Sequence, residues 1–228
     1  MSGNLYTRKM EEMYDTISQQ CEELNTELDK LGPLAKQMHL LSSNAVSSAA
    51  RAGSDGNAFR VLTQDIQLLG DDISGSINDS QLLIGTVITL ASELVTLFSH
   101  YMDQINCEHQ LEDTKNGSSN TFTDTDKQSI IKEINYHNRK LSQNIGLLTS
   151  ALDPIGVVVK KGEYIAIFSS VEAANAGQHG ESFEAVASML RVLVGRLSQQ
   201  SKRQQSLLRD LSEAMELQSN QEKLIYKW

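Results

Sequence analysis

Apolar residues recur along the first part of the chain at alternating steps of three and four positions. The members of this seam are Met10, Met13, Ile17, Cys21, Leu24, Leu28, Leu31, Leu34, Met38, Leu41, Ala45 and Ala49. An apolar stripe with this spacing is typical of a coiled coil or of a helix in a bundle. The pattern therefore predicts a long helical arm that buries one narrow face along its whole length.

The same rhythm returns in three later stretches. It runs through residues 59–105, resumes at 130–152, and appears again over 183–215. The run Asn-Gly-Ser-Ser at 116–119 separates the second stretch from the third and is typical of a loop. The chain is thus expected to form four helical arms, two on each side of a linker.

Two glycine pairs interrupt this pattern. The stretch SSAARAGSDGNAF (47–59) contains Gly53 and Gly56, and VEAANAGQHGESF (171–183) contains Gly177 and Gly180, each 124 positions further on. Glycine inside a helix costs about 1 kcal/mol relative to alanine, but it permits sharp reversals of the chain. We therefore interpret each pair as the tip of an antiparallel helical hairpin, and the common spacing as an internal repeat.

The expected organisation is a first hairpin over 1–110 with its tip near Ser54, a linker over 111–124, and a second hairpin over 125–228 with its tip near Gln178. A connection of this length reaches at most roughly 55 Å, whereas each arm would be about 75–80 Å long. Hairpins lying side by side must therefore have both tips at one end. The predicted fold is an all-α, long antiparallel four-helix bundle, with an end-to-end dumbbell or a swapped dimer as alternatives.

One segment, DPIGVVVKKGEYIAIF (153–168), is ambiguous because its alternating apolar residues could also form a β-hairpin. Pro154 would break or kink a helix at this point. Pro33 lies in the matching region of the first half. We favour a kinked helix in both halves over a pair of strands.

Composition narrows the class of protein. Aromatic residues make up 5% of the chain and there are two prolines, which suits long helices with narrow seams. The net charge of −9 argues against a nucleic-acid partner, which clustered Lys and Arg would bind. Cys21 and Cys107 do not form a disulfide framework and no secretory leader pattern opens the sequence, so a cytoplasmic location is expected.

The apolar segment 82–98 has 17 residues and includes Glu93. A membrane-spanning helix needs about 20 mostly apolar residues, so a membrane partner is not expected. Leu83, Leu90 and Leu97 form a seven-residue stripe beside the main seam. This stripe is either a wider core-facing surface or a surface for self-association.

No arrangement of residues points to catalysis. The chain shows no nucleophile–base pair, no phosphate-binding loop and no carboxylate dyad, so neither an enzyme nor a cofactor is expected. Cys107, His109 and His100 have no spacing that fits a standard metal site. No metal is predicted.

The two tip stretches resemble a known family. IAIFSSVEAANAGQHGESFEAVASMLRVLVGRLS (165–198) and LSSNAVSSAARAGSDGNAFRVLTQDIQLLG (41–70) are similar to the signalling tip of methyl-accepting chemotaxis proteins. In that family each of two subunits contributes one hairpin to a four-helix bundle. The tips contact other dimers, a coupling protein and a histidine kinase. The resemblance implies that this one chain carries both hairpins.

The resemblance also implies which residues bind partners and which make the turns. The partner-binding residues would be Leu40, Leu41, Asn44, Ser48, Arg51, Val61, Ile165, Glu172 and Asn175. The tip turns would be built by Gly53, Gly56, Phe59, Gly177, Gly180 and Phe183.

The tips depart from the family pattern, which has a Glu followed three residues later by an Arg. The first half has Ser48 and Arg51 at these positions, and the second half has Glu172 and Asn175. Arg51 and Glu172 are expected to pair with each other across the hairpins, to contact a partner, or to stay solvated. The apolar Val61 is matched by Ala185 in the second half.

The expected function is that of a non-catalytic, chemoreceptor-like signalling or adaptor protein. It would act through its hairpin tip on a coupling protein, a histidine kinase or receptors. The alternative is a structural or scaffolding coiled-coil protein of the same ancestry that does not contact a kinase.

Overall fold

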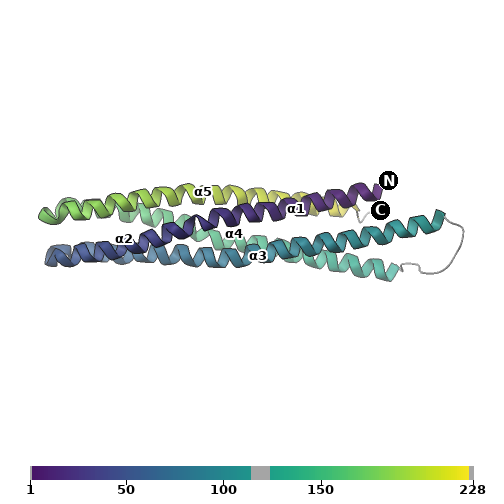
Figure 1. The fold of residues 1–228 in the computed structure, drawn as a ribbon, viewed down its shortest axis with the longest axis horizontal. Coiled ribbons are helices and arrows are strands. Elements are labelled where there is room, and N and C mark those ends of the chain that lie inside the picture. Colours follow the sequence, from purple (N-terminus) through teal and green to yellow (C-terminus); the bar gives the residue numbers. More distant parts are fainter. Residues whose placement is uncertain (1, 114–123, 226–228) are drawn as a thin grey trace. The chain divides into compact units, whose positions relative to one another are not determined.

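The computed structural model describes residues 2–113 and 124–225, and all regular structure in these residues is helical (Figure 1). The helices are α1 (Ser2–Asp29), α2 (Leu31–Arg51), α3 (Asn57–Asp113), α4 (Asp124–Asn175) and α5 (Gly180–Ile225), with short 3-10 turns η1 (Gly53–Gly56) and η2 (Gly177–His179). The prediction of an all-α helical bundle is confirmed. Most of the expected linker, residues 114–123, lies outside the described residues.

Both proline-containing regions are helical. The first predicted arm is divided at Lys30 into α1 and α2, and Pro33 lies in the first turn of α2, where the missing backbone N–H of a proline is tolerated. Pro154 lies within the continuous helix α4. The helical interpretation of 153–168 is confirmed, and the alternative pair of strands is wrong because Ile155, Val158 and Ile165 are buried at helical spacing.

The chain divides into two compact units. Unit 1 comprises Met1–Glu23, Leu83–Leu147 and Leu208–Trp228, and unit 2 comprises Leu24–Leu82 and Leu148–Leu207. Each unit contains segments from both sides of the linker. The assignment of 1–110 and 125–228 to two hairpin domains remains a prediction.

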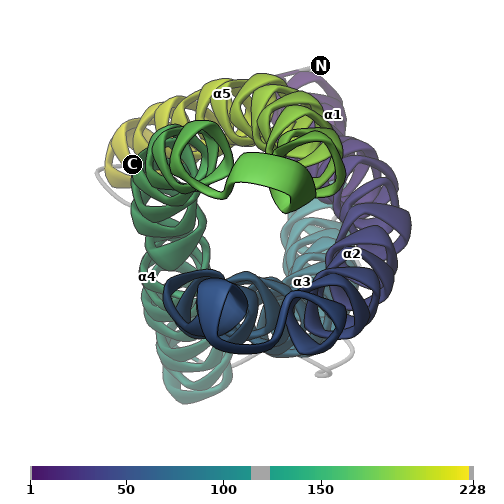
Figure 2. The ribbon, with the colours of Figure 1, turned by 90° about the vertical axis from the view of Figure 1, so that its left-hand side faces the viewer.

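Unit 2 contains both turns, η1 and η2. The two turns lie at the same end of this unit (Figure 2). The rings of Phe59 and Phe183, which follow the two turns, stack with their centroids 4.0 Å apart. The apolar core of this unit runs from these rings along all its helices. Its buried members include Leu28, Leu31, Met38, Ile66, Leu69, Ile73, Leu152, Ile155, Leu190, Leu193 and Leu197.

Unit 1 has a core of the same kind with one polar contact inside it. Met10, Ile17 and Cys21 are buried as the seam predicts. The predicted member Met13 is only half-buried, and its neighbour Tyr14 is fully buried instead. The Tyr14 hydroxyl donates a hydrogen bond of 3.2 Å to Asn138 Oδ1 on α4. A phenol can occupy a core position when its hydroxyl finds such a partner.

Helix α3 carries the most apolar stretch. Within the described residues it is the one helix that is long and apolar enough to cross a bilayer, by length and composition, and 28% of the apolar window is buried. Leu83, Leu90 and Leu97 are half-buried in unit 1, beside the buried seam residues Ile84 and Ala91. Self-association through this leucine stripe remains a prediction.

Candidate functional site at the helical turns of unit 2

The first glycine of each pair makes the reversal of the chain possible. Gly53 has a φ of 59° and Gly177 a φ of 54°. Both values lie in the left-handed region, which a residue with a Cβ atom occupies only at a cost. The left-handed residue ends the incoming helix, and a single 3-10 turn then leads into the outgoing helix.

The second glycine of each pair has a different role. A Cβ atom on Gly56 would overlap the carbonyl oxygen of Ala49, and a Cβ atom on Gly180 would lie 2.6 Å from the carbonyl oxygen of Ala173. The outgoing helix therefore starts in direct contact with the backbone of the incoming one. The spacing of three places one glycine at the reversal and the next at this close contact.

The two turns are joined by an aromatic pair. Phe59 and Phe183 are each 1% exposed, and their rings are nearly parallel, with an interplanar angle of 9°. Stacking of this kind contributes about 0.5–1.5 kcal/mol beyond the burial of the rings. Because one ring comes from each half of the chain, the pair fixes the positions of both turns in unit 2.

Hydroxyl groups add a second connection between the halves. Ser182 Oγ donates to Ser48 Oγ at 2.9 Å, and Arg51 Nη2 approaches the same Ser48 oxygen at 3.5 Å. No ion pair joins Arg51 to Glu172 in this part of unit 2. The Arg51 side chain is exposed and the Glu172 side chain is half-buried.

The nine predicted partner-binding residues fall into two groups. Leu40, Asn44, Arg51, Val61 and Asn175 are exposed and Glu172 is half-buried, whereas Leu41, Ser48 and Ile165 are buried. Leu40 is 65% exposed and Val61 is 60% exposed. The exposed group can touch another molecule directly. The buried group packs inside unit 2 and holds its neighbours in place.

The sequence interpretation missed an exposed apolar surface on α4. Tyr164, Ile167, Phe168 and Val171, here called the α4 strip, are 62%, 62%, 42% and 51% exposed. The rings of Tyr164 and Phe168 pack together with centroids 4.4 Å apart. Their helical spacing was a usable signal, but the ambiguous alternation in 153–168 concealed it. Large apolar side chains gathered in this way mark interaction surfaces more often than single ones do.

An open groove lies next to the α4 strip. It has a volume of about 440 Å³ and is lined by Asp65, Leu68, Leu69 and Asp72 of α3 and by Lys160, Lys161, Tyr164 and Ile165 of α4. A second hollow of about 540 Å³ is lined by residues 172 and 175–179 at the η2 turn. In the described residues no three His, Cys, Asp or Glu side chains gather in a way that could hold a metal ion. These open hollows offer a surface for recognition, unlike the enclosed pockets typical of small-molecule sites.

The fold and this site define a class: a helical bundle that displays paired turns and an exposed apolar strip. Comparisons with known proteins specify the class further. Part of the chain is 29% identical over 100 residues to the putative sensory transducer protein YvaQ of Bacillus subtilis. It is 27% identical over 88 residues to the biofilm dispersion protein BdlA and 28% identical over 81 residues to the methyl-accepting chemotaxis protein CtpL, both of Pseudomonas aeruginosa.

These similarities are partial. They cover 43%, 39% and 36% of this chain but only 18%, 21% and 12% of the respective relatives. No family model matches the chain, and no solved structure matches it. The similarities support, in part of this chain, a signalling domain like that of methyl-accepting chemotaxis proteins.

Proposed function

We propose that this protein is a non-catalytic adaptor of a chemosensory system. It acts through the turn end of unit 2 on a chemotaxis coupling protein, a histidine kinase or receptors, and it does so in the cytoplasm. The proposal extends the general signalling role that the similarities to sensory transducers support.

The observation that carries the proposal is the combination of fixed turns and exposed apolar side chains in unit 2. The Phe59–Phe183 stack and the glycine contacts fix the turns. The α4 strip and Val61 expose large apolar groups beside them. A rigid surface loses little conformational entropy on binding, so its apolar area contributes more fully to affinity.

The charged residues of the turn end give this surface its polar part. Arg51 is exposed and makes only a long contact with Ser48, so its guanidinium is available for a carboxylate on a partner. In the second half, Asn175 occupies the matching position and is also exposed. The two halves therefore present different polar groups at equivalent places.

A scaffolding protein without kinase contact is the competing function. It is favoured by the burial of Ser48, which stands where the related tips have an acidic residue and which bonds to Ser182 instead of facing solvent. In this second candidate, the turns only stabilise the bundle.

Sedimentation velocity on the full chain, mixed with a coupling protein and a histidine kinase, separates the two functions. We expect a faster-moving complex that is weakened by Arg51→Glu and by Tyr164→Ser. Lys202→Glu is the matched control, because Lys202 is exposed on α5 well beyond the turn. If no complex forms with the unaltered chain, or if the control weakens it as much as the turn variants do, the adaptor function is wrong and scaffolding remains.

A further inference from the structure

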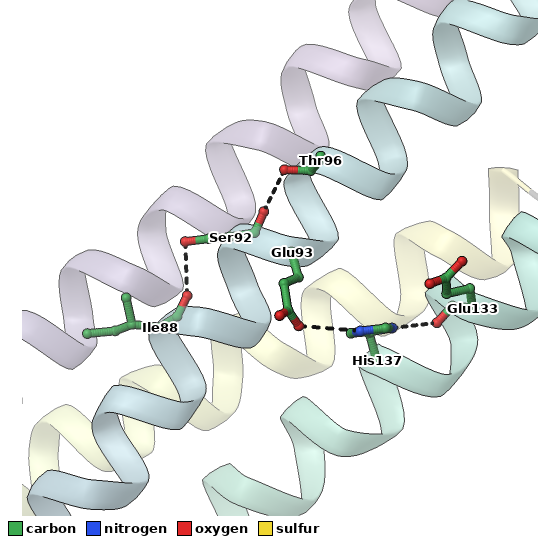
Figure 3. A network of polar contacts seen from close by, with 6 residues as sticks. All are labelled: Ile88, Ser92, Glu93, Thr96, Glu133 and His137. Carbon is green, nitrogen blue, oxygen red and sulfur yellow. Dashed lines mark hydrogen bonds and ion pairs between the residues drawn. The ribbon is translucent and has the colours of Figure 1, made fainter.

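Among the described residues, the following three contacts between an acidic and a basic side chain join the N-terminal half of the chain to the C-terminal half. In unit 2, Arg203 Nε lies 2.9 Å from Glu27 Oε1, and Lys161 Nζ lies 3.8 Å from Asp72 Oδ2. In unit 1, His137 Nε2 lies 3.3 Å from Glu93 Oε2, as Figure 3 shows. In every pair the acid belongs to residues 1–110 and the base to residues 125–228.

Contacts between residues 124 positions apart show which positions of the two halves correspond. Tyr14 bonds to Asn138 in unit 1, and Phe59 stacks on Phe183 in unit 2. A residue that contacts its own counterpart lies on a two-fold or pseudo-two-fold axis. In each unit, the two halves therefore face one another as two copies of one hairpin would.

This correspondence shows which side chains would face each other if two identical hairpins paired. The counterpart of Arg203 in the first half is Asp79. If the first hairpins of two chains paired, Glu27 of one chain would face Asp79 of the other. Two acidic groups would then replace the present ion pair, which costs free energy instead of releasing it.

Pairing between second hairpins creates the opposite conflict. The counterpart of Asp72 in the second half is Arg196, so Lys161 of one chain would face Arg196 of the other. The contact between Glu93 and His137 is lost in pairings of like hairpins, because the counterparts of these two residues are Leu217 and Met13.

The Glu27 contact dominates this preference because its carboxylate is buried. The Glu27 side chain is 5% exposed, and its Oε1 accepts contacts from both Lys30, at 2.7 Å, and Arg203. The other oxygen, Oε2, is buried without a hydrogen-bond partner. A buried carboxylate depends strongly on its cations. The Asp72–Lys161 pair is 46% and 59% exposed, so solvent screens it and it contributes less.

We propose that these charges make the pairing of the hairpins selective for unlike partners. The first hairpin presents an acidic surface that accepts the basic surface of the second hairpin, and each surface rejects its own kind. The partner that the first hairpin selects is therefore a second hairpin, which in this structure is the second hairpin of the same chain. Specificity of this type needs both an attraction in the correct pair and a repulsion in the wrong ones, and both are present.

An exchange of charges in the full chain tests the proposal. Asp79→Arg combined with Arg203→Asp leaves the net charge unchanged but reverses the preference. Glu27 then faces an aspartate within the chain and an arginine when two first hairpins meet. Asp103→Lys with Lys202→Asp is the matched control, because these exposed residues take part in none of the three contacts described above.

A cysteine on the axis reports which hairpins meet. In a Cys21→Ala, Cys107→Ser background, Tyr14→Cys can form a disulfide between chains only when two first hairpins pair. We expect the exchange to raise the disulfide-linked dimer at least about tenfold over the parent and the control. Equal crosslinking in all three chains, whether high or low, would overturn the proposal.

A second measurement covers the case in which the exchanged chain does not fold. In a Lys30→Gln background, Arg203→Glu should lower the melting temperature by a few degrees, and adding Glu27→Arg should restore it. If the reversed pair restores nothing, the Glu27–Arg203 contact does not select the partner and the proposal fails.

Discussion

The hydroxyl of Tyr14 donates a 3.2 Å hydrogen bond to Oδ1 of Asn138, and both side chains are buried in unit 1. The two residues come from opposite halves of the chain. Hydrogen bonds of this type are directional, so the contact favours one rotation of α1 against α4. Apolar contacts alone would allow neighbouring registers at little cost.

Removing this contact should destabilise the protein modestly. Tyr14→Phe keeps the ring and deletes the hydroxyl, which should cost about 1 kcal/mol and lower the melting temperature by about 2–4 °C. Tyr136→Phe is the matched control, because Tyr136 is 53% exposed. Thermal unfolding followed by circular dichroism measures both. An equal loss in the two variants would contradict a specific role for the buried hydroxyl.

Alanine scanning of the glycines should separate turn positions from ordinary helix positions. Gly53→Ala should cost about 1–2 kcal/mol because of its left-handed backbone, and Gly56→Ala should destabilise through the clash with Ala49. Gly75 and Gly195 lie in α3 and α5 with nothing within 4 Å of an added Cβ atom. There alanine should stabilise by about 0.5–1 kcal/mol. Chemical denaturation measures the change in the free energy of unfolding for all four variants. If all four changes had the same direction, the distinction between turn glycines and ordinary helix glycines would be wrong.

The two cysteines should differ in reactivity. Burial raises the pKa of the Cys21 thiol from 9.0 to about 12, and the nearby charge of Glu22 adds to the effect. Cys107 is exposed. At pH 8, iodoacetamide should therefore modify Cys107 in the folded protein and reach Cys21 only after denaturation. Intact mass spectrometry with Cys107→Ser as control checks this, and fast labelling of that variant would be inconsistent with a buried Cys21.

The raised pKa also predicts how stability depends on pH. The folded protein holds the Cys21 proton more tightly than the unfolded chain does. The stabilisation from this group is therefore complete below about pH 9 and is lost as the pH rises toward 12. Cys21→Ala should remove the part of the stability loss at alkaline pH that comes from ionisation of this thiol. Urea unfolding across this pH range, compared with the unaltered chain, measures the difference.

Polar substitutions on the α4 strip should leave the fold intact. Tyr164→Ser and Ile167→Ser remove side chains that are both 62% exposed, so the melting temperature should change little while binding of a signalling partner falls. Ile165→Ser is the contrasting variant, since Ile165 is 6% exposed and its change should cost about 2–5 kcal/mol. Stability losses as large for Tyr164→Ser as for Ile165→Ser would show that the strip belongs to the core.

Much of the fold could be predicted from the sequence because it depends on short-range periodicity. The apolar seams fixed the helices, and the spacing of glycines such as Gly53 and Gly56 located the turns. The choice of Tyr14 over Met13 as the buried residue could not be predicted. It depends on a hydrogen-bond partner, Asn138, that only the packed helices bring within reach.

The site was harder to predict than the fold for the same reason. The resemblance assigns Leu41 and Ile165 to a partner-binding surface, but both side chains are buried in the core. Ion pairs such as Glu27–Arg203 depend on the register between distant helices, which no local pattern encodes. The α4 strip could be recognised from the helical spacing of its apolar residues. The same segment, however, also contains apolar residues at alternating positions, a pattern that is typical of a β-strand.

The stack of Phe59 on Phe183 holds together two turns that belong to one polypeptide. In an assembly of identical subunits, any substitution in a turn appears twice, and subunits can exchange with those of other molecules. Here each turn is inherited as a separate stretch of the same gene, and every molecule contains one of each. The two turns can thus acquire different sequences while every molecule still contains one copy of each. The matching positions Arg51 and Asn175 already differ in this way.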